Sequence, residues 1–336
     1  MRVPRPLLLL PLALAACAKP ATDGAPSSNS SGASSGSTAS TPSPWSGEAG
    51  ASLSCSADHW CEIMSVKKGA LHSIWGSNSG NVFALWSGAI VHYDGLNWKP
   101  LEGFDSRRFW GLGGTGLTNV WAVGDQGVAL HFEGRWQEVP TPTKSTLRAV
   151  FPHDVKNAWA VGEAGAIIHW DGAVWTATQA PAEAKDTPLQ AVWASGNTDA
   201  WAVGDGGTIL HWNGTAWSAI PGVPRVALAT VWGTGPTDVW AAGLAGTILH
   251  YDGKEWHPVA SGTSVGLYAG WAEDPSNAWV IGEKGTILHY DGKGWTPSPS
   301  GTQDDLHGIW GPIGRDLWMV GFSMKSGETS TWRRKS

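Results

Sequence analysis

Several features are scarce in this chain of 336 residues, and each absence narrows the class of protein. Only three cysteines are present, which is too few for a disulfide-dense scaffold. Charged residues make up 15 % of the chain, and no basic stripe is found among them, which argues against nucleic acid as a partner. No window carries a sustained apolar stripe with the period of an amphipathic helix, so a helical solenoid is not expected.

Tryptophan, in contrast, is abundant, and its 24 copies recur in a unit of about 39 residues. One column of the repeat contains Trp60, Trp98, Trp136, Trp175, Trp217, Trp256 and Trp295. A second column contains Trp75, Trp110, Phe151, Trp193, Trp232, Trp271 and Trp310. A third contains Phe83, Trp121, Trp159, Trp201, Trp240, Trp279 and Trp318. A histidine column contains His92, His131, His169, His211, His250 and His289, with Thr331 aligned to it in the last copy. A fixed period of this length is typical of a repeat architecture.

Each unit contains four short runs of β-branched and aromatic residues bounded by Gly, Asn, Asp and Pro, the pattern of short strands joined by turns. Pairs such as Asp94-Gly95 and Asp252-Gly253 predict two-residue hairpins between the third and fourth strands. We therefore predict an all-β fold, a seven-bladed β-propeller of four-stranded antiparallel blades, over residues 52–332. The last unit lacks a fourth strand, and we expect the segment around Trp60 to supply it. Residues near 58–64 should then pair with residues near 328–332, which closes the ring and protects its edges.

The N-terminus has the features of an export signal. Arg2 and Arg5 precede an apolar stretch, residues 7–16, that is too short to span a bilayer, so we assign residues 1–16 to a signal peptide. Residues 14–17, Leu-Ala-Ala-Cys, resemble the bacterial lipobox, in which the cysteine carries the lipid; this would make Cys17 the attachment site. Ala18 follows it in place of Asp, and the resemblance then implies the outer membrane. The alternative is an ordinary signal peptide with an incidental cysteine.

Residues 17–51 are rich in Ser, Gly and Pro and predict a flexible tether that the lipid anchors. Without residues 1–16 the chain keeps 20 basic and 28 acidic residues, a net charge of −8. Residues 333–336, which include Arg333 and Arg334, are expected to form a short solvated basic tail.

The two remaining cysteines, Cys55 and Cys61, flank Trp60, and in an oxidising compartment we expect them to form a disulfide. Two buried thiols are the alternative. His59 lies between them, but two sulfurs are too few for a metal site.

The six repeated histidines suggest a metal ring, but a third strand lies far from the axis of a propeller, so these side chains cannot share one ion. We expect them to be structural, each hydrogen-bonded to a neighbouring turn or strand. The turn acids Asp94, Glu133, Asp171, Asp252 and Asp291 are expected to cap turns, since acidic side chains bind backbone N–H groups there.

The unit Asp-Gly-x-x-Trp after an apolar strand looks like a shortened Asp-box. It resembles the bacterial BNR or Asp-box-like propellers, including the photosystem II assembly-factor type, within the wider WD40, YVTN and BNR group. The spacing is one residue shorter than in a true Asp-box, and the arginine triad of sialidases is not recognisable, so that activity does not carry over. Tectonin-type lectins, which bind glycans, show a weaker similarity in their Val-Trp-x-Val runs.

These patterns contain no catalytic constellation, and neither a cofactor nor a metal is expected. We therefore expect a monomeric, non-catalytic binding or assembly scaffold in the cell envelope, on the periplasmic or the surface side. Its partner would be an envelope protein recognised through propeller loops, and its only membrane contact the lipid. A surface glycan bound in the manner of a lectin is the alternative, and a glycan-cleaving enzyme in the axial channel is a third hypothesis.

Departures from the repeat are the places where a unique site is expected, because loops on a rigid scaffold carry specificity. Three segments depart from it. They contain Arg107 and Arg108 before the second blade, Glu183, Lys185 and Asp186 within residues 177–188, and Phe322 and Lys325 within residues 322–328. Drift in unselected loops would produce the same departures.

Overall fold

The computed structural model describes residues 55–334, apart from residues 68, 105, 313, 315 and 324–326. All of these belong to the second of two units of the chain, Pro42–Ser336. The predicted signal peptide, Cys17, the tether and Lys325 lie outside the described residues. Among those that are described, no helix is long and apolar enough to cross a membrane.

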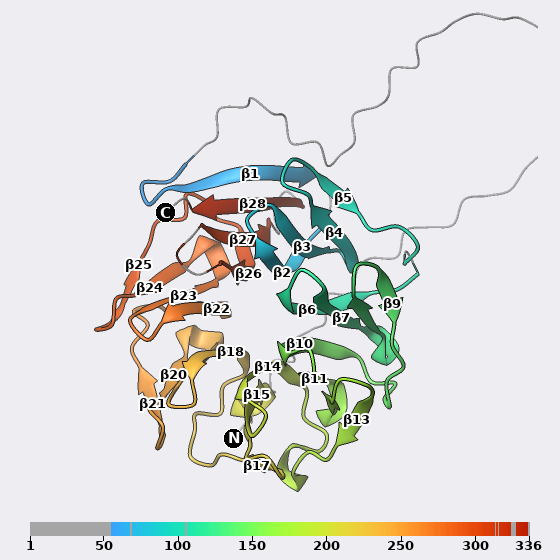
Figure 1. The fold of residues 1–336 in the computed structure, drawn as a ribbon. Helices are drawn as coiled ribbons and strands as arrows, with labels where there is room; N and C mark the ends of the chain where they lie inside the picture. The colour runs from blue at the N-terminus through green and yellow to red at the C-terminus, as the bar shows by residue number, and fades with distance from the viewer. Residues whose placement is uncertain are drawn as a thin grey trace, which may run out of the picture. The chain divides into compact units, whose positions relative to one another are not determined.

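The described residues form seven antiparallel sheets of four strands each, arranged as the blades of a ring (Figure 1). The predicted seven-bladed β-propeller is thereby confirmed. Blade 1 contains β2 (Leu71–Asn78), β3 (Asn81–Trp86), β4 (Ala89–Tyr93) and β5 (Trp98–Pro100). Blade 2 contains β6 (Phe109–Gly116), β7 (Asn119–Gly124), β8 (Ala129–Phe132) and β9 (Trp136–Glu138). Blade 3 contains β10 (Leu147–Asp154), β11 (Asn157–Gly162), β12 (Ile167–Trp170) and β13 (Trp175–Thr178).

The remaining blades repeat this arrangement. Blade 4 contains β14 (Leu189–Gly196), β15 (Asp199–Gly204), β16 (Ile209–Trp212) and β17 (Trp217–Ala219). Blade 5 contains β18 (Leu228–Gly235), β19 (Asp238–Gly243), β20 (Ile248–Tyr251) and β21 (Trp256–Val259). Blade 6 contains β22 (Leu267–Asp274), β23 (Asn277–Gly282), β24 (Ile287–Tyr290) and β25 (Trp295–Pro297). Blade 7 contains β26 (Asp305–Trp310), β27 (Leu317–Phe322), β28 (Glu328–Arg334) and β1 (Trp60–Lys67).

Six short 3₁₀ turns complete the described secondary structure. Five of them join the second and third strands of blades 2 to 6: η1 (Asp125–Gly127), η2 (Glu163–Gly165), η4 (Asp205–Gly207), η5 (Leu244–Gly246) and η6 (Glu283–Gly285). The sixth, η3 (Ala182–Ala184), lies in the connection from blade 3 to blade 4.

The ring closes as predicted, by the N-terminal strand β1 pairing with β28 in the last blade. The register runs from Trp60 opposite Arg334 to Lys67 opposite Glu328. Strand β28 therefore extends two residues past the predicted end of the propeller at residue 332. Arg333 and Arg334 are strand residues in the structure, where the sequence suggested a solvated tail.

Cys55 and Cys61 form a disulfide with a Cα–Cα distance of 4.0 Å. Cys61 lies inside β1, directly after Trp60. Because Cys55 precedes β1 and Cys61 lies within it, the disulfide joins the segment just before β1 to the strand that closes the ring.

Tryptophans at two repeat positions build the interfaces between blades. Those of the second strands are at most 4 % exposed. Each ring at this position, including Phe83, meets the fourth-strand tryptophan of the next blade edge-on, at centroid distances of 5.0–6.4 Å. Trp60 follows the same rule and packs on Trp279 at 5.7 Å. Edge-to-face packing adds to the burial of these large rings, so repetition of tryptophan reflects the assembly of the ring.

One predicted column was wrong in blade 2. The first-strand tryptophans lie opposite the second-strand ring, as Trp75 does opposite Phe83. In blade 2 the residue opposite Trp121 is Gly113, and Trp110 lies three residues earlier in β6. Trp110 therefore occupies a different position, near the start of β6.

The two-residue hairpins were also predicted wrongly. Between β4 and β5 the loop has four residues, and the Asp94 N–H donates to the Asn97 carbonyl at 3.1 Å. Gly95 alone has a left-handed φ in this loop, 93°. Oδ1 of Asp94 accepts the N–H groups of Leu96 and Asn97 at 3.0 and 2.8 Å, so the acid caps the turn through its side chain.

Candidate functional site

The histidine column forms six separate structural units, each within its own blade. Every imidazole packs on the second-strand ring of that blade with centroids 4.0–4.4 Å apart. Its Nε2 shares a hydrogen bond of 2.5–2.9 Å with the Oδ1 of an Asn or Asp. No group of three or more potential metal ligands is found among the described residues.

The Asn or Asp partner is a column that the sequence analysis missed. Its members begin the second strands: Asn81, Asn119, Asn157, Asp199, Asp238 and Asn277. Each lies two residues before the second-strand ring, and this fixed spacing is the signal that could have revealed it. Burial lowers the pKa of His92, His131, His169 and His289, all four of which face an Asn. A neutral amide cannot offset the cost of a buried imidazolium, so these rings stay neutral near pH 7.

Blade 7 replaces the histidine by an arginine. The predicted equivalent, Thr331, was wrong, because the residue opposite Trp318 is Arg333. The Arg333 guanidinium lies 5.3 Å from the centre of the Trp318 ring and is ion-paired with Asp316. Asp316 stands two residues before Trp318, in the same place as the Asn and Asp residues of the other blades.

Antiparallel order gives the ring two distinct faces. Turns between first and second strands and between third and fourth strands share one, which we call the hairpin face; Gly80 and Gly95 approach each other there. The turns between second and third strands lie on the opposite face of the ring, together with the connections between blades. We call this the connection face. Gly165 of η2 meets the backbone of Lys185 on this face.

The described residues of all three segments that depart from the repeat lie on the connection face. Arg107 and Arg108 belong to the connection from β5 to β6, where the Arg107 guanidinium pairs with Glu138 at 2.7 Å. Glu183, Lys185 and Asp186 are exposed in the connection from β13 to β14. Phe322 is the last residue of β27 and is only 7 % exposed, so it is a packed strand residue, where the sequence suggested a loop.

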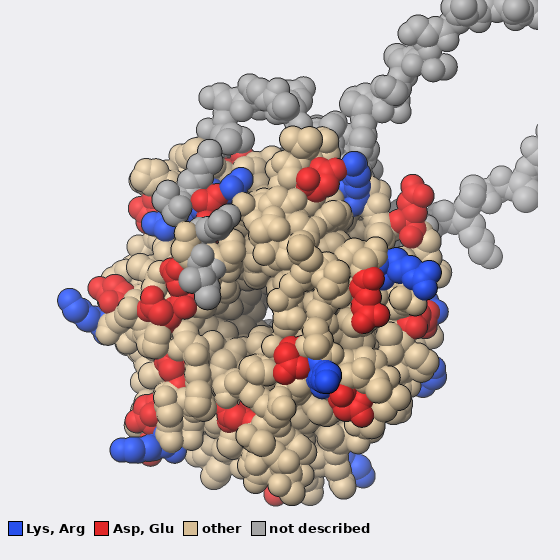
Figure 2. All heavy atoms as spheres, viewed as in Figure 1, with Lys and Arg blue, Asp and Glu red and all other residues tan. Residues whose placement is uncertain are grey.

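A second set of non-repeating residues lies at the connection-face ends of the innermost strands (Figure 1). Each member is the residue directly after the buried residue near the start of its strand, and we call this set of residues the mouth ring. Its members are His72, Trp110, Arg148, Gln190, Ala229, Tyr268 and His307. Figure 2 shows the axial opening of the ring, where most atoms belong to uncharged residues.

In four blades, the mouth-ring side chain donates a hydrogen bond to an acid fifteen residues later, on the turn between the second and third strands. The Trp110 Nε1 donates to Asp125 at 2.7 Å, and the Tyr268 hydroxyl donates to Glu283 at 2.6 Å. The Arg148 Nε donates to Glu163 at 2.7 Å, and the Gln190 Nε2 donates to Asp205 at 2.9 Å. These carboxylates share one repeat position and hold the mouth ring in place.

Blades 6, 7, 1 and 2 bring aromatic rings together into one arc. Tyr268 stacks on His307 at 4.9 Å and His307 stacks on Phe322 at 5.0 Å, both nearly parallel. His72 lies 6.0 Å from His307 and 6.0 Å from Trp110. We call these five residues the aromatic arc. Blades 3, 4 and 5 present Arg148, Gln190 and Ala229 instead, so the mouth is chemically asymmetric.

Burial lowers the pKa of both histidines of the aromatic arc. That of His307 falls to about 4, with a further contribution from His72, and that of His72 is lowered by burial alone. Both rings are therefore uncharged near pH 7.

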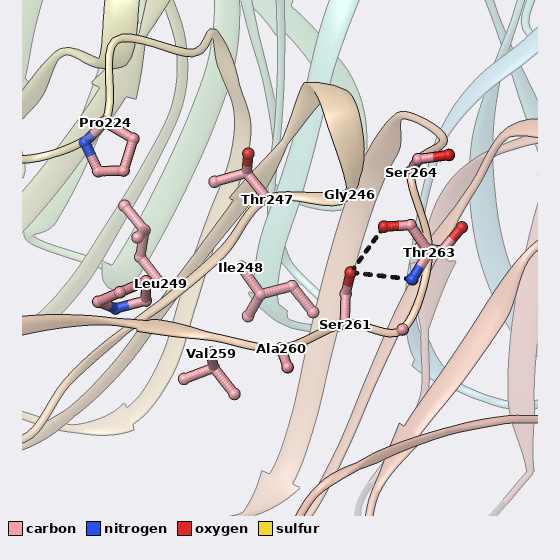
Figure 3. A pocket seen from close by; sticks show the side chains of 12 residues that line it. Pro224, Gly246, Thr247, Ile248, Leu249, Val259, Ala260, Ser261, Thr263 and Ser264 are labelled. Carbon is pink, nitrogen blue, oxygen red and sulfur yellow. Dashed lines mark hydrogen bonds between the residues drawn. The ribbon is translucent and has the colours of Figure 1, made fainter.

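An open groove of about 740 Å³ lies elsewhere, between β20, β21 and the connection that follows them (Figure 3). Its lining includes Ile248, Leu249, Val259 and Ser261, and Ser261 is hydrogen-bonded to the backbone of Thr263. Residues 39 positions later, Ile287, Leu288 and Ser300, line a similar groove in blade 6. Because the groove repeats, it follows from the packing of blades and does not mark a unique site.

The ring and its connection face define the chain as a seven-bladed β-propeller with a non-repeating mouth. No family model matches the chain, and no curated protein matches it in sequence. Among solved structures it is similar to YCF48 bound to a D1 peptide, with a TM-score of 0.66 at 17 % identity over 88 % of this chain and 99 % of that one.

YCF48 from Cyanidioschyzon merolae gives a TM-score of 0.66 at 16 % identity, over 82 % of this chain and 99 % of its own. The WD40 β-propeller domain of Doa1 gives 0.64 at 9 % identity, over 81 % of this chain and 96 % of that domain. At these identities the likeness concerns the fold.

Proposed function

We propose that this protein is a non-catalytic binding or assembly scaffold of the cell envelope that recognises a protein partner through its connection face. The lipid on Cys17 would hold it at the outer membrane, and residues 17–51 would carry the ring away from the bilayer. Fold alone does not define the function of a propeller, so the proposal depends on where this ring departs from its own repeat.

One observation carries the proposal: the non-repeating residues collect on a single face. The mouth ring, the Arg107–Arg108 segment and the exposed Glu183, Lys185 and Asp186 all lie there. A rigid ring with chemically varied groups on one face is suited to recognition. The solved structure of YCF48 with a D1 peptide supports a peptide-binding role for a ring of this fold.

The arrangement of carboxylates favours binding over catalysis. Asp125, Glu163, Asp205 and Glu283 occupy one repeat position, and each accepts a hydrogen bond from the mouth ring. A glycosidase requires two carboxylates with separate roles on either side of the scissile bond. Repeated acids that position other side chains do not have this form.

A surface glycan is the second candidate, and Trp110 is the observation in its favour. It is the only mouth-ring tryptophan and is half-buried, so part of its ring faces solvent. The repeated second-strand tryptophans are buried between blades and offer no stacking surface.

Affinity capture from envelope extracts tests the proposal. The full chain should retain a defined protein partner, and the double change Glu283→Gln and Trp110→Leu should abolish retention. The control Leu96→Gln alters an exposed residue of the hairpin face and should retain the partner. Equal capture by both variants would contradict the connection face as the binding surface. Loss of capture on digestion of polysaccharide, but not of protein, would favour the glycan.

A further inference from the structure

We propose that the aromatic arc binds the cationic side chain of an arginine or lysine, presented by an extended basic segment of the partner. The inference rests on the proposed function and specifies the chemistry of the segment that the connection face recognises.

The first argument is the geometry of the aromatic rings. Tyr268, His307 and Phe322 form a stack with interplanar angles of 5° and 13°. His72 stands edge-on to this stack, at 71° to His307 and 70° to Phe322. Aromatic faces attract cations through their quadrupole. His307 is stacked on both Tyr268 and Phe322, so the rings that can receive a cation are those of Tyr268, His72 and Trp110. Tyr268, His72 and Trp110 are half-buried, so solvent reaches the arc.

The second argument is the charge around the arc. Glu283 stands at one end of it beside Tyr268, and Asp125 stands at the other beside Trp110. Their donors, a phenol and an indole, are neutral, so the hydrogen bonds orient the carboxylates without cancelling their charge. Glu163 differs, because the Arg148 guanidinium neutralises it. The arc thus lies between two negative charges that attract a cation.

The histidines do not oppose a cation near neutral pH. The pKa of His307 is lowered to about 4 by burial and by His72, and burial lowers the pKa of His72 as well. The Nε2 of His307 is buried and has no hydrogen-bond partner among the described residues, which fits an uncharged ring.

Several cations lie on this face, among them the exposed Lys185 and Lys284, the latter next to Glu283 in η6. Arg148 is paired with Glu163 and Arg107 with Glu138, so both charges are compensated. Arg108 is exposed, lies beside Gly88 and stands two residues before Trp110 in the sequence. It should repel a bound basic side chain, and removing its charge should strengthen binding.

The experiment is a calorimetric titration of the full chain, in detergent at pH 7.5 and low salt, with two capped hexapeptides. One contains three arginines alternating with glycine, and in the other citrulline, which has the same shape without charge, replaces arginine. We expect the arginine peptide to bind at least about tenfold more tightly. Glu283→Gln, Asp125→Asn and Trp110→Leu should each weaken its binding about threefold to tenfold, and Arg108→Gln should strengthen it.

Asp252→Asn is the matched control, since Asp252 is an acid of the hairpin face that caps a turn in the same way as Asp94. It should leave binding unchanged. Equal affinity for the citrulline peptide, no heat with the arginine peptide at millimolar concentration, or an equal loss in Asp252→Asn would each overturn the inference. If the partner is captured through the connection face while the arginine peptide fails to bind, the proposed function stands and this inference fails. If the peptide binds and no protein partner is captured, the arc is a cation site but the proposed function fails.

Discussion

Arg333 lies over the ring of Trp318 and is ion-paired with Asp316, so that in the last blade an arginine makes the contacts that histidine makes in the other six. At the next position, Arg334, an arginine again replaces a ring side chain of the other blades. Arg334 lies 5.0 Å from the centre of the Trp279 ring, where the corresponding positions of the other blades have Tyr, Phe or Trp. A planar guanidinium can stack on an aromatic face and pair with a carboxylate at once, which explains the exchange.

Replacing Arg333 by Ala should lower the free energy of unfolding by about 2 kcal/mol, because it removes both the ion pair with Asp316 and the packing of the guanidinium on the Trp318 ring. Arg333→His should cost less than about 1 kcal/mol, since it restores the side chain of the other blades. Urea unfolding followed by tryptophan fluorescence measures both. The exposed pair Arg107 and Glu138 is the control, and Arg107→Ala should cost about 0.5 kcal/mol or less. Equal losses in Arg107→Ala and Arg333→Ala would show that the stacked pair has no special role.

Trp60 closes the ring, and its removal should be more costly than that of an exposed apolar residue. It is 1 % exposed and packs on Trp279. Trp60→Ala should lower the free energy of unfolding by about 3–5 kcal/mol, whereas Leu96→Ala should change it by less than about 0.5 kcal/mol. Hydrogen exchange should show the loss first in the amides of β1 and β28. Exchange that increases uniformly over all blades would contradict a local closing strand.

Stability should fall as the pH drops from about 6.5 to about 4. The pKa of His307 is about 4 in the folded chain and 6.5 as the reference for the unfolded one. Between these values the unfolded chain binds more protons, so the free energy of unfolding decreases as the pH falls, and this contribution levels off below pH 4. His72, His92, His131, His169 and His289 shift in the same direction.

Urea titrations at pH 7.5, 5.5 and 4 measure this effect. His307→Phe keeps a ring in the stack without a titrating group, and should reduce the total loss by about 2–3 kcal/mol. The carboxylates titrate in both proteins, so the difference between them isolates His307. An identical loss in the variant would show that the pKa of His307 is not lowered in the folded chain, and would also weaken the case for a cation at the arc.

The architecture could be predicted because it depends on properties that repeat. Seven copies of one Trp pattern identify the blades, and an incomplete last unit with a stray Trp60 identifies the closing strand. Errors arose where position was inferred from residue type. Trp110 was counted with the other first-strand tryptophans, although strand pairing places Gly113 at that position. Thr331 was aligned with histidines for want of a histidine, although pairing places Arg333 there.

The mouth ring could not be predicted from the sequence, because its residue types do not repeat. The mouth ring has seven members of six different types, so no column stands out in the sequence. Its arc forms only because blades 6 and 7 meet blades 1 and 2 when the ring closes, bringing Tyr268 and His307 into one group with His72 and Trp110. The spacing of fifteen residues to an acid, as from Trp110 to Asp125, was present in the sequence, but its meaning depends on the turn geometry.

Site-specific photocrosslinking in cells that express the full chain tests the central claim, that a protein partner binds the connection face. A photoreactive residue would replace Arg108 on that face or Leu96 on the hairpin face, the latter 85 % exposed and apolar. We predict a discrete protein adduct from position 108, lost in the presence of Trp110→Leu, and none from position 96. Adducts from position 96 alone, or from neither position, would contradict the account.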